Sequence, residues 1–398
     1  MVKINYLDSN LKIEGKRVLL RVDFNVPLNN GSITEDSRIK KILPTIKFLI
    51  DKKAKIIIIS HIGRPMGKII PSLTLEPIAK KLSNLLEKKV IFLNEVIGAN
   101  VVEKSKKISN GEVLLLENLR FYKEEESNSD NFAKELSKNG DIYVNEAFSC
   151  SHRAHASVSK ITNYINSFAG HQLIEEINTI KMLLNDSKKP ISCIIGGSKI
   201  STKIGILNNL IKKMDNIIIV GAMANNFLKY KNYNIGKSIY EKNTENLIID
   251  ILKKSNVNNC KIIIPIDVVV SKSYNSKGQT KSLDKINDLD LILDIGSKTI
   301  ENISKIIDNS KTVLWNGPAG YFEVDEFSHG SNEIAKKITE NTKNKSLISI
   351  AGGGDTVAVI NKFNFYNGFT YISTAGGAFL ELLEGKILPG IKALEINE

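Results

Sequence analysis

The stretch 171-HQLIEEINTIKMLLND-186 has the pattern of an amphipathic helix. Its apolar residues recur at the spacing of one helix face, at Leu173, Ile174, Ile177, Ile180 and Leu184. Gly170 precedes the stretch and Pro190 follows it, which predicts where the helix ends. All six arginines lie before it, and most glycines lie after it. We therefore interpret it as a helix connecting two domains, the alternative being a surface helix within one domain.

Length and composition bound the class of protein. The 398 residues are 42% hydrophobic and 25% charged, as expected for a soluble globular chain of two or three domains. No apolar run approaches the roughly 18 residues of a membrane span, and 1-MVKINYLDSN-10 lacks the apolar core of a signal peptide. The three cysteines have no CxxC spacing, which argues against a disulfide framework or a zinc site. We expect a cytoplasmic protein with no membrane partner.

The net charge of +12 leaves two kinds of anionic partner open, nucleic acid and small substrates. Lysines are spread along the whole chain, and no block of five like charges occurs. We therefore expect small anionic substrates and no nucleic acid. A protein that keeps such sites but uses its basic surface on nucleic acid is the rival interpretation.

Short apolar runs alternate with helical patterns in both halves of the chain. Strands are predicted at 17–22, 55–60, 90–94, 112–118, 141–145, 190–196, 216–221, 261–270, 290–296, 312–317, 346–354 and 370–377. Helices are predicted at 37–50, 74–88, 129–140, 203–214, 244–255, 299–309, 331–343, 356–363 and 378–386. Such alternation, with nearly continuous apolar strands, indicates buried parallel sheets. The predicted fold is α/β, with two doubly wound, Rossmann-like parallel-sheet domains joined by a connecting helix.

Ligands of doubly wound sheets bind beyond the carboxyl ends of the strands. In the first half these positions are polar and basic: Asp23, Asn25, Arg38, His61, Arg64, Arg120, His152, Arg153 and His155. An arginine offers a planar fork for phosphate or carboxylate. We expect these groups to hold a small, multiply charged anion. The alternative is that each arginine makes its own surface ion pair.

The histidines permit a metal interpretation as well. His152 and His155 are three residues apart, a possible spacing for two metal ligands, and His61 follows another strand. No cysteine or carboxylate accompanies them in a ligand pattern. Contact with phosphate, or packing within loops, is therefore the preferred interpretation.

In the second half the strands end in glycines, at 196-GGSK-199, Gly221, Gly296, 317-GPAG-320, 352-GGGDT-356 and 376-GG-377. Glycine lets backbone N–H groups approach a phosphate, and helix N-termini favour anions. Lys199 and Lys203 are placed to reach a transferring phosphoryl group, and Asp355 to hold Mg²⁺ on nucleotide phosphates. Neither a Walker A motif nor GxGxxG occurs. Tight turns are the alternative cause of each single glycine cluster.

The chain resembles the phosphoglycerate kinase family nearly from end to end. The motifs that carry the resemblance are 21-RVDFNVP-27, 61-HIGRP-65, 118-NLRF-121, 152-HRAH-155, 196-GGSKISTK-203, 315-WNGPAGYFE-323, 352-GGGDT-356 and 373-STAGGAFLELLEG-385. The resemblance implies phosphoryl transfer between 1,3-bisphosphoglycerate and ADP, giving 3-phosphoglycerate and ATP. It implies a monomer that uses Mg²⁺ with its nucleotide. The implied division is a phosphoglycerate-binding domain at 1–170, a connecting helix at 171–187, a nucleotide-binding domain at 188–377, and a segment at 378–398 that packs back on the first domain.

The resemblance also implies roles for individual residues. Those expected to hold the phosphoglycerate are Asp23, Phe24, Asn25, Arg38, His61, Ile62, Gly63, Arg64, Arg120 and Arg153. Those expected to hold the nucleotide are Lys199, Lys203, Gly221, Gly296, Asn316, Glu323, Gly353, Gly354, Asp355 and Thr356, with Asp355 on the metal. Those expected to act on the phosphoryl group in transfer are Arg38, Lys199, Gly353 and Gly376.

Several positions depart from the family's usual pattern. Thr202 stands where an Asp is common, Glu146 replaces an Asp, and Ala375 and Phe379 replace Gly and Ser. Residues 149–151, Ser-Cys-Ser, replace a run of Gly/Ala type. None of these changes removes a principal charged residue, so we expect them to affect rate before identity.

The implied reaction needs no general base. Its nucleophile in the ATP-consuming direction is a carboxylate, which is ionised at pH 7 because its ordinary pKa is about 4. Catalysis then consists of positioning and charge neutralisation. Because the two anions are expected on separate domains, the sequence predicts closure about the helix at 171–186.

Overall fold

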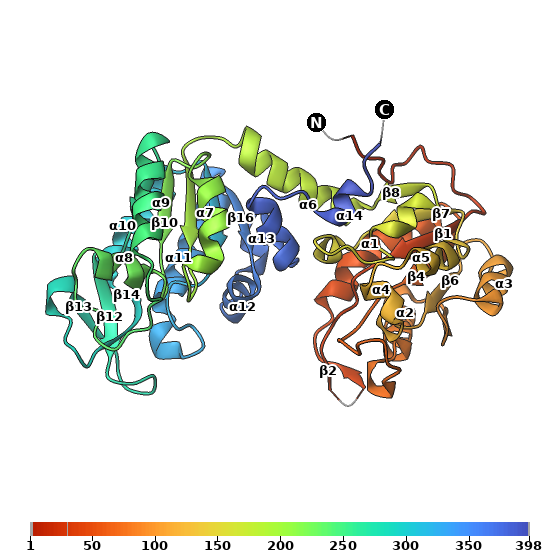
Figure 1. Ribbon diagram of the computed structural model, residues 1–398, viewed down its shortest axis with the longest axis horizontal. Coiled ribbons are helices and arrows are strands. Elements are labelled where there is room, and N and C mark those ends of the chain that lie inside the picture. The colour runs from red at the N-terminus through yellow and green to blue at the C-terminus, as the bar shows by residue number, and fades with distance from the viewer. Residues whose placement is uncertain (1–2, 30, 397–398) are drawn as a thin grey trace. The chain divides into compact units, whose positions relative to one another are not determined.

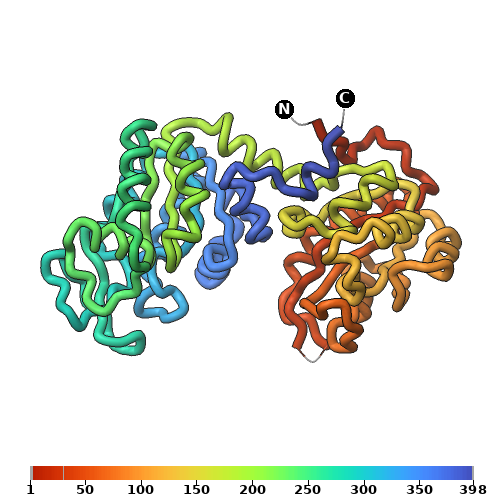
Figure 2. The backbone as a smooth tube through the Cα atoms, in the orientation of Figure 1, coloured from red at the N-terminus to blue at the C-terminus, as the bar shows by residue number. Residues whose placement is uncertain are grey.

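The computed structural model describes residues 3–29 and 31–396, which form two compact units. Unit 1 consists of the described residues of Met1–Asn178 and Ile387–Glu398, and unit 2 is Thr179–Lys386. Figure 2 traces the chain, whose blue C-terminal end belongs to the unit that contains the red N-terminal end. The boundary between the units falls inside α6 (His171–Lys181), which continues as the π-helical turn η5 (Met182–Asp186).

Helix α6 begins where the sequence predicts, and Glu146 explains why. The buried carboxylate of Glu146 accepts hydrogen bonds from the N–H of Leu173 (3.1 Å) and from the hydroxyl of Thr45. An anion is favourable beside the N–H groups of a first helical turn. A Cβ on Gly170 would lie 2.1 Å from this carboxylate, so the position requires glycine. The contacts of Glu146 therefore fix the start of α6.

Unit 1 contains a six-stranded parallel sheet in the order β5-β6-β4-β1-β7-β8 (Figure 1). The strands are β1 (Arg17–Arg21), β4 (Lys55–Ile59), β5 (Val90–Leu93), β6 (Val113–Leu116), β7 (Ile142–Asn145) and β8 (Ser167–Ala169). The five strands predicted in this half are confirmed: β1, β4, β5 and β6 end one or two residues before the predicted end, and β7 ends at the predicted Asn145. Strand β8 and the hairpin β2 (Leu28–Asn29) and β3 (Ser32–Ile33) were not predicted, because they are only two or three residues long.

The helices of unit 1 are α1 (Ser37–Asp51), α2 (Glu76–Leu86), α3 (Ala99–Lys107), α4 (Lys123–Glu126), α5 (Asp130–Ser137) and α14 (Pro389–Lys392). Short 3₁₀ turns are η1 (Pro71–Leu73), η2 (Leu119–Phe121), η3 (Phe148–Cys150) and η4 (Lys160–Asn163). The Ser129 hydroxyl accepts from the N–H of Phe132, which confirms the predicted start of α5. Helix α1 continues through Pro44 as one element. Helix α3 was not predicted.

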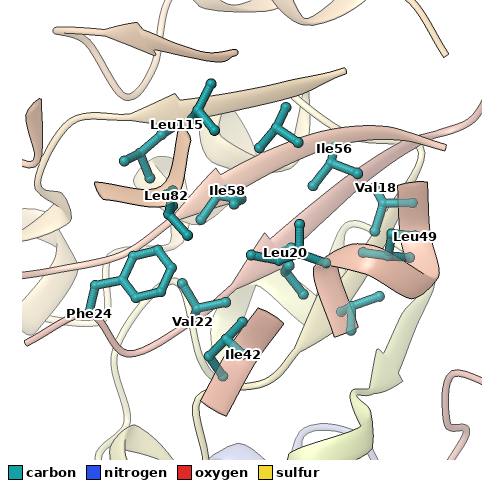
Figure 3. Close-up of a cluster of buried hydrophobic side chains, with 14 of the residues drawn as sticks. Val18, Leu20, Val22, Phe24, Ile42, Leu49, Ile56, Ile58, Leu82 and Leu115 are labelled. Carbon is teal, nitrogen blue, oxygen red and sulfur yellow. The ribbon is translucent and has the colours of Figure 1, made fainter. Parts of the chain in front are cut away.

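Both faces of this sheet are buried. Along β1, Val18 and Leu20 belong to the cluster under α1 and α2, whereas Leu19 belongs to the cluster on the other face. Figure 3 shows the first cluster, in which side chains from β1, β4 and β6 meet Ile42 and Leu49 of α1. The continuous apolar strands are thus explained by helices on both sides.

Unit 2 contains a second six-stranded parallel sheet, in the order β11-β10-β9-β15-β16-β17. The strands are β9 (Ile191–Ile195), β10 (Asn216–Ile219), β11 (Lys261–Ile263), β15 (Thr312–Asn316), β16 (Ile348–Gly352) and β17 (Tyr371–Ser373). The chain adds strands outward on one side of β9, then returns to add β15 on its other side. The point where the order reverses lies between β9 and β15, and there the doubly wound fold leaves a ligand crevice.

The prediction of one strand at 261–270 is wrong. The run divides into β11 and β12 (Asp267–Ser271), which belong to different sheets. Pro265 has no N–H to donate to a ladder, and the N–H of Asp267 donates to the Thr299 hydroxyl at 3.1 Å. Strand β12 pairs antiparallel with β13 (Gln279–Ser282) and with β14 (Leu291–Ile295), so the predicted strand at 290–296 is also outside the parallel sheet.

The helices of unit 2 are α7 (Ile204–Leu210), α8 (Ala224–Tyr230), α9 (Glu245–Val257), α10 (Ser297–Asn309), α11 (His329–Lys345), α12 (Gly354–Lys362) and α13 (Gly377–Leu383). Its 3₁₀ turns are η6 (Ser201–Lys203), η7 (Leu283–Lys285), η8 (Asp325–Phe327) and η9 (Tyr366–Gly368). Helix α8 was not predicted. Helix α13 belongs to unit 2, so the return to unit 1 begins at Ile387 rather than at residue 378. In the described part of the chain, no helix has the length and apolarity needed to span a bilayer.

Candidate active site

The carboxyl ends of β1, β4, β6 and β7 are neighbours in the sheet of unit 1, and the polar loops predicted from the sequence follow these strands. Asp23 is the centre of this edge. Its Oδ2 receives Arg38 Nη1 at 2.6 Å and the hydroxyl of Ser149, and its Oδ1 accepts from the N–H of Asn25 at 2.9 Å. Burial raises the pKa of Asp23, but His61, Arg38 and the hydrogen bonds from Ser149 and Asn25 outweigh it and hold the pKa below its ordinary value. Asp23 is therefore an anion that fixes Arg38 at the sheet edge.

The loop after β4 is held from two sides. The N–H of Gly63 donates to Asn25 Oδ1 at 2.9 Å, and the carbonyl of Gly63 accepts from Arg120 Nη1 at 2.7 Å. Gly63 has φ +65°, and a Cβ there would lie 2.8 Å from Leu73. Arg64 follows immediately and is exposed. Three separate loops are thereby joined, and Arg64 projects from their junction.

The loop after β7 adds further cationic groups. Arg153 Nε donates to His152 Nε2 at 3.2 Å. Burial, together with Arg21, Arg120 and Arg153, lowers the pKa of His155 to about 4. Burial is the largest of these causes, and the three guanidinium groups add to it, so His155 lies among the cationic side chains that an anion site requires.

The structure separates two predicted residues from the polar edge. Phe24 and Ile62 are buried in the apolar cluster under α1 and α2. Their N–H groups already donate within the protein, to Ser60 Oγ at 2.9 Å and to Asn118 Oδ1 at 3.3 Å. Both side chains therefore anchor their loops in the apolar cluster and point away from the polar edge.

Arg21 is a member of the site that sequence reasoning missed. It is the last residue of β1 and is 1% exposed. Its contacts reach Ser157, His61 and Cys150, all at the sheet edge. Its place in 21-RVDFNVP-27 was the available signal, but a residue inside an apolar strand was not expected to point to the site.

Asp23, His61 and Cys150 raise the question of a metal in unit 1. One ligand atom from each lies within 4.8 Å of the others. However, Arg21 Nη2 lies 3.2 Å from His61 Nδ1 and 3.8 Å from Cys150 Sγ, and Arg38 holds Asp23 at 2.6 Å. Two guanidinium groups at these distances oppose a divalent cation. We assign no metal to this cluster.

In unit 2 the loops after β9 and β15 touch through glycines. The N–H of Gly196 donates to the carbonyl of Asn316 at 2.9 Å. A Cβ on Gly196 would lie 2.2 Å from the Pro318 carbonyl, and one on Gly317 would lie 2.4 Å from the Gly196 carbonyl. No larger residue fits at either position, so the reversal point of the sheet is lined by backbone.

Lys203 is held beside these glycine loops by a hydrogen bond to a side chain. Its Nζ donates to Asn316 Oδ1 at 2.6 Å, and Asn316 Nδ2 donates to the carbonyl of Gly352 at 2.6 Å. The N–H of Gly317 donates to Thr356 Oγ1 at 2.7 Å. Three loops, after β9, β15 and β16, are thus connected. Burial lowers the pKa of Lys203.

Gly353 directly precedes α12 with φ +98°, and a Cβ there would lie 2.5 Å from Asn316 Nδ2. Gly354 and Asp355 follow in the first turn and are exposed, as is Lys199 after β9. Gly376 similarly precedes α13, with φ +56° and open space around its Cα. These positions leave backbone N–H groups of helix starts accessible to an anion.

A cavity of about 300 Å³ adjoins these loops, with Gly197, Gly221, Pro318, Glu323 and Asp355 in its wall. Its other walls are mainly apolar, from β12, β14 and α8. A cavity with this apolar lining and phosphate-directed loops at its side fits a nucleotide base and sugar. Asp355 presents an exposed carboxylate to the same space, which fits a Mg²⁺ ion that keeps water and phosphate ligands.

Gly296 has a different environment from the one predicted. A Cβ there would lie 2.3 Å from the carboxyl carbon of Asp267, and its N–H donates to the Asp267 carbonyl at 3.0 Å. Asp267 in turn accepts from the N–H groups of Lys298 and Thr299 at the start of α10. Packing against this capping carboxylate excludes a larger residue at Gly296, and its neighbour Ile295 lines the cavity.

Comparisons with known proteins agree with this geometry. A sequence model described as phosphoglycerate kinase matches residues 8–386. The chain is 45% identical over 384 residues to a phosphoglycerate kinase of Bartonella bacilliformis, covering 96% of each chain. It is 46% identical over 395 residues to one of Wolbachia pipientis, covering 99% of each. The solved structure of phosphoglycerate kinase from Coxiella burnetii superposes with a TM-score of 0.89 at 40% identity, covering 97% of each chain.

Proposed function

The chain belongs to the phosphoglycerate kinase family, and from this premise we propose which of its residues perform each part of the reaction. The enzyme transfers a phosphoryl group reversibly between 1,3-bisphosphoglycerate and ADP, giving 3-phosphoglycerate and ATP, a step of glycolysis. What remains to be assigned is where each substrate binds and how the transfer is promoted.

The phosphoglycerate binds at the carboxyl edge of the sheet in unit 1. The observation that carries this assignment is the junction of loops around Asp23, which fixes Arg38 and joins the loops that bear His61, Arg64 and Arg120. Guanidinium groups pair bidentately with phosphate and carboxylate oxygens, the two charged groups of this substrate. Asn25 is exposed beside them and offers its amide to the substrate.

The nucleotide binds in unit 2. Its base and sugar occupy the cavity, and its phosphates meet the N–H groups of the glycine loops with Lys199 and Lys203. Asp355 holds the nucleotide's Mg²⁺, which supplies charge neutralisation to the phosphates when bound. Lys199 is exposed and Lys203 is fixed by Asn316, so the first is free to follow the moving phosphoryl group while the second stays in place.

No proton transfer is required of the protein. The carboxylate that attacks ATP in one direction is already ionised at neutral pH. Arg38, Lys199 and the N–H groups at Gly353 and Gly376 instead neutralise the charge of the group in transfer. In-line transfer requires contact between substrates held in different units, so we place a hinge in α6, the helix that contains the unit boundary.

The cellular setting follows from the same premise. We expect the enzyme to act as a cytoplasmic monomer, where a glycolytic step takes place. The three cysteines are free and buried, which suits a reducing compartment.

A coupled assay of ATP consumption in the presence of 3-phosphoglycerate tests the proposal. We expect turnover that requires both 3-phosphoglycerate and Mg²⁺, and none with glycerate lacking the phosphate. A gel shift with nucleic acid at physiological salt, run in parallel, tests the rival use of the basic surface. Retarded nucleic acid together with absent turnover would contradict the assignment.

A further inference from the structure

Arg21 lies inside unit 1, where a charged side chain is costly unless it is paired. Its Nε donates to Ser157 Oγ at 2.9 Å, and Nη1 donates to the carbonyl of Val22. Ser157 in turn donates to Glu125 Oε1 at 2.6 Å, and its N–H donates to Glu125 Oε2 at 2.9 Å. Glu125 is fully buried, so the two opposite charges are linked through one serine. The guanidinium is thereby held in one orientation.

This orientation decides the protonation of His61. Arg21 Nη2 lies 3.2 Å from His61 Nδ1, and both groups are buried. A guanidinium has only donors and stays protonated in proteins, so Nδ1 must accept. An imidazole ring that accepts at Nδ1 carries its single proton on Nε2. The contact therefore selects one neutral tautomer.

The groups around His61 also oppose a second proton. Burial, together with Arg21, Arg120 and His155, lowers the pKa of His61 well below its ordinary value. Asp23 acts in the opposite direction, and Cys150 is the remaining titratable neighbour. Attraction to Asp23 does not outweigh burial and the cationic groups, so the ring is neutral at pH 7.

The Nε2–H group is left available. Nε2 lies 3.9 Å from Asp23 Oδ1, longer than a hydrogen bond, and Oδ1 already accepts from the N–H of Asn25. The Nε2 side of the ring thus lies next to the Asp23–Arg38 pair, at the edge assigned above to the phosphoglycerate.

We propose that Arg21 is a positioning residue that holds His61 as the neutral Nε2–H tautomer, so that Nε2–H donates to an oxygen of the bound phosphoglycerate. The location of the substrate rests on the proposed function, whereas the tautomer does not. The arrangement keeps this donor unchanged over the pH range in which a free histidine would gain a charge.

The direct test is the nitrogen spectrum of the ligand-free enzyme labelled with ¹⁵N-histidine. The chain has five histidines, and His61→Gln identifies the His61 signals. In the wild type we expect an unprotonated Nδ1 and a protonated Nε2, unchanged from pH ~5.5 to ~8.5. A proton on Nδ1, or titration near the ordinary pKa of about 6.5, would overturn the inference.

A matched pair of variants tests the role of Arg21. Arg21→Met with Glu125→Gln removes the buried charges together, and His61 should then show both tautomers and titrate closer to its ordinary pKa. Arg17→Met with Asp141→Asn removes the ion pair at the other end of β1, whose atoms are 2.6 Å apart, and should leave the His61 spectrum unchanged. An Arg21 variant with a wild-type His61 spectrum would contradict the positioning role. If that variant fails to fold, the wild-type spectrum alone decides the inference.

Substrate binding separates this inference from the proposed function. 3-Phosphoglycerate should shift the His61 Nε2 signal, and ADP should not. His61→Gln keeps an N–H donor and should retain most of the affinity for 3-phosphoglycerate, whereas His61→Leu should weaken it ~10- to 100-fold. Equal affinities would remove the donor role. A wild-type His61 with the expected tautomer but no response to 3-phosphoglycerate would instead contradict the assigned substrate site.

Discussion

In unit 1 the proposed anion site is made of side chains, whereas in unit 2 it is made mainly of backbone. Arg38, Arg120 and Arg21 reach the sheet edge of unit 1 through contacts with carboxylates, carbonyls and hydroxyls. At the reversal point of unit 2, Gly196 and Gly317 lie so close that neither position accommodates a Cβ. The geometry of the first site depends on pairing between charged and polar side chains. The geometry of the second depends on positions that have no Cβ.

The same contrast appears in one buried carboxylate of each unit. Asp23 is paired with Arg38, and the net effect of its surroundings is a lowered pKa. Asp294 of unit 2 accepts hydrogen bonds from the backbone N–H groups of Gly330 and Ile295, and burial raises its pKa to about 7. Among the described residues no cation contributes to the pKa of Asp294, whose causes are burial and these two N–H groups. Cations stabilise a buried carboxylate in unit 1, and the N–H groups in unit 2 do so less completely.

The largest effect is expected at Arg38. Arg38→Ala should lower turnover by at least ~10²- to 10³-fold, the scale for removing a preorganised donor from a transition state. Lys40→Ala, two residues further along α1, is the matched control, because Lys40 is exposed and its ion pair is with Asp36, away from Asp23. Steady-state kinetics with folded variants measures both. Near-normal turnover of Arg38→Ala would remove it from the mechanism.

Asp294 tests the carboxylate comparison through stability. Its pKa is raised in the folded state from 3.8 to about 7, so the folded protein binds the proton more tightly than the unfolded chain. The free energy of unfolding should therefore fall as the pH rises from about 4 to about 7, by on the order of 2–4 kcal/mol. Urea titrations across this range measure it, and Asp294→Asn should remove that part of the slope. Parallel pH profiles for variant and wild type would contradict the raised pKa.

Two adjacent glycines test whether the loop geometry of unit 2 requires a position without a Cβ. Gly353→Ala places a Cβ 2.5 Å from Asn316 Nδ2 at φ +98°, and should cost roughly 1–3 kcal/mol and raise the KM for ATP. Gly354→Ala meets open space in the first turn of α12 and should leave the melting temperature unchanged. Thermal melts of the two variants decide the point. Equal melting temperatures would mean that the Gly353 backbone is not the constraint.

The smallest effect is expected at Thr202, where the family commonly has an acid. Thr202 is exposed, and its hydroxyl donates to the carbonyl of Lys199 at 2.9 Å. An exposed carboxylate between Lys199 and Lys203 is largely screened by solvent, so Thr202→Asp should change turnover by less than about threefold. A tenfold change in either direction would show that this departure tunes the site.

The sequence predicted most of the fold because the two parallel sheets are buried on both faces. Runs such as Val18–Leu20 and Ile56–Ile58 are apolar without alternation, a pattern typical of such sheets. Prediction failed at short elements such as β8, and at 261–270, where an apolar run passes from one sheet to another at Pro265. Apolarity measures burial, and it does not identify the sheet in which a strand lies.

Some residues of the candidate sites could be predicted from their position after a strand, whereas others could not. Arg38 and Asp23 follow strands, so sheet topology alone brings them together. Arg21 could not be predicted as a site residue, because its role comes from long-range contacts with Ser157 and His61. The packing of Gly296 against Asp267, which excludes a Cβ there, could not be predicted from its place after a strand. The position of a residue in the sequence indicates which loop it occupies. It does not indicate the long-range contacts that require that residue type.

Hydrogen–deuterium exchange with each ligand alone tests most directly whether the two anions bind in separate units. 3-Phosphoglycerate should slow exchange at 61–65 and 118–121 in unit 1 and leave unit 2 unchanged. ADP with Mg²⁺ should slow exchange at 196–203 and 352–357 in unit 2 and leave unit 1 unchanged. Protection of the same unit by both ligands would contradict the account.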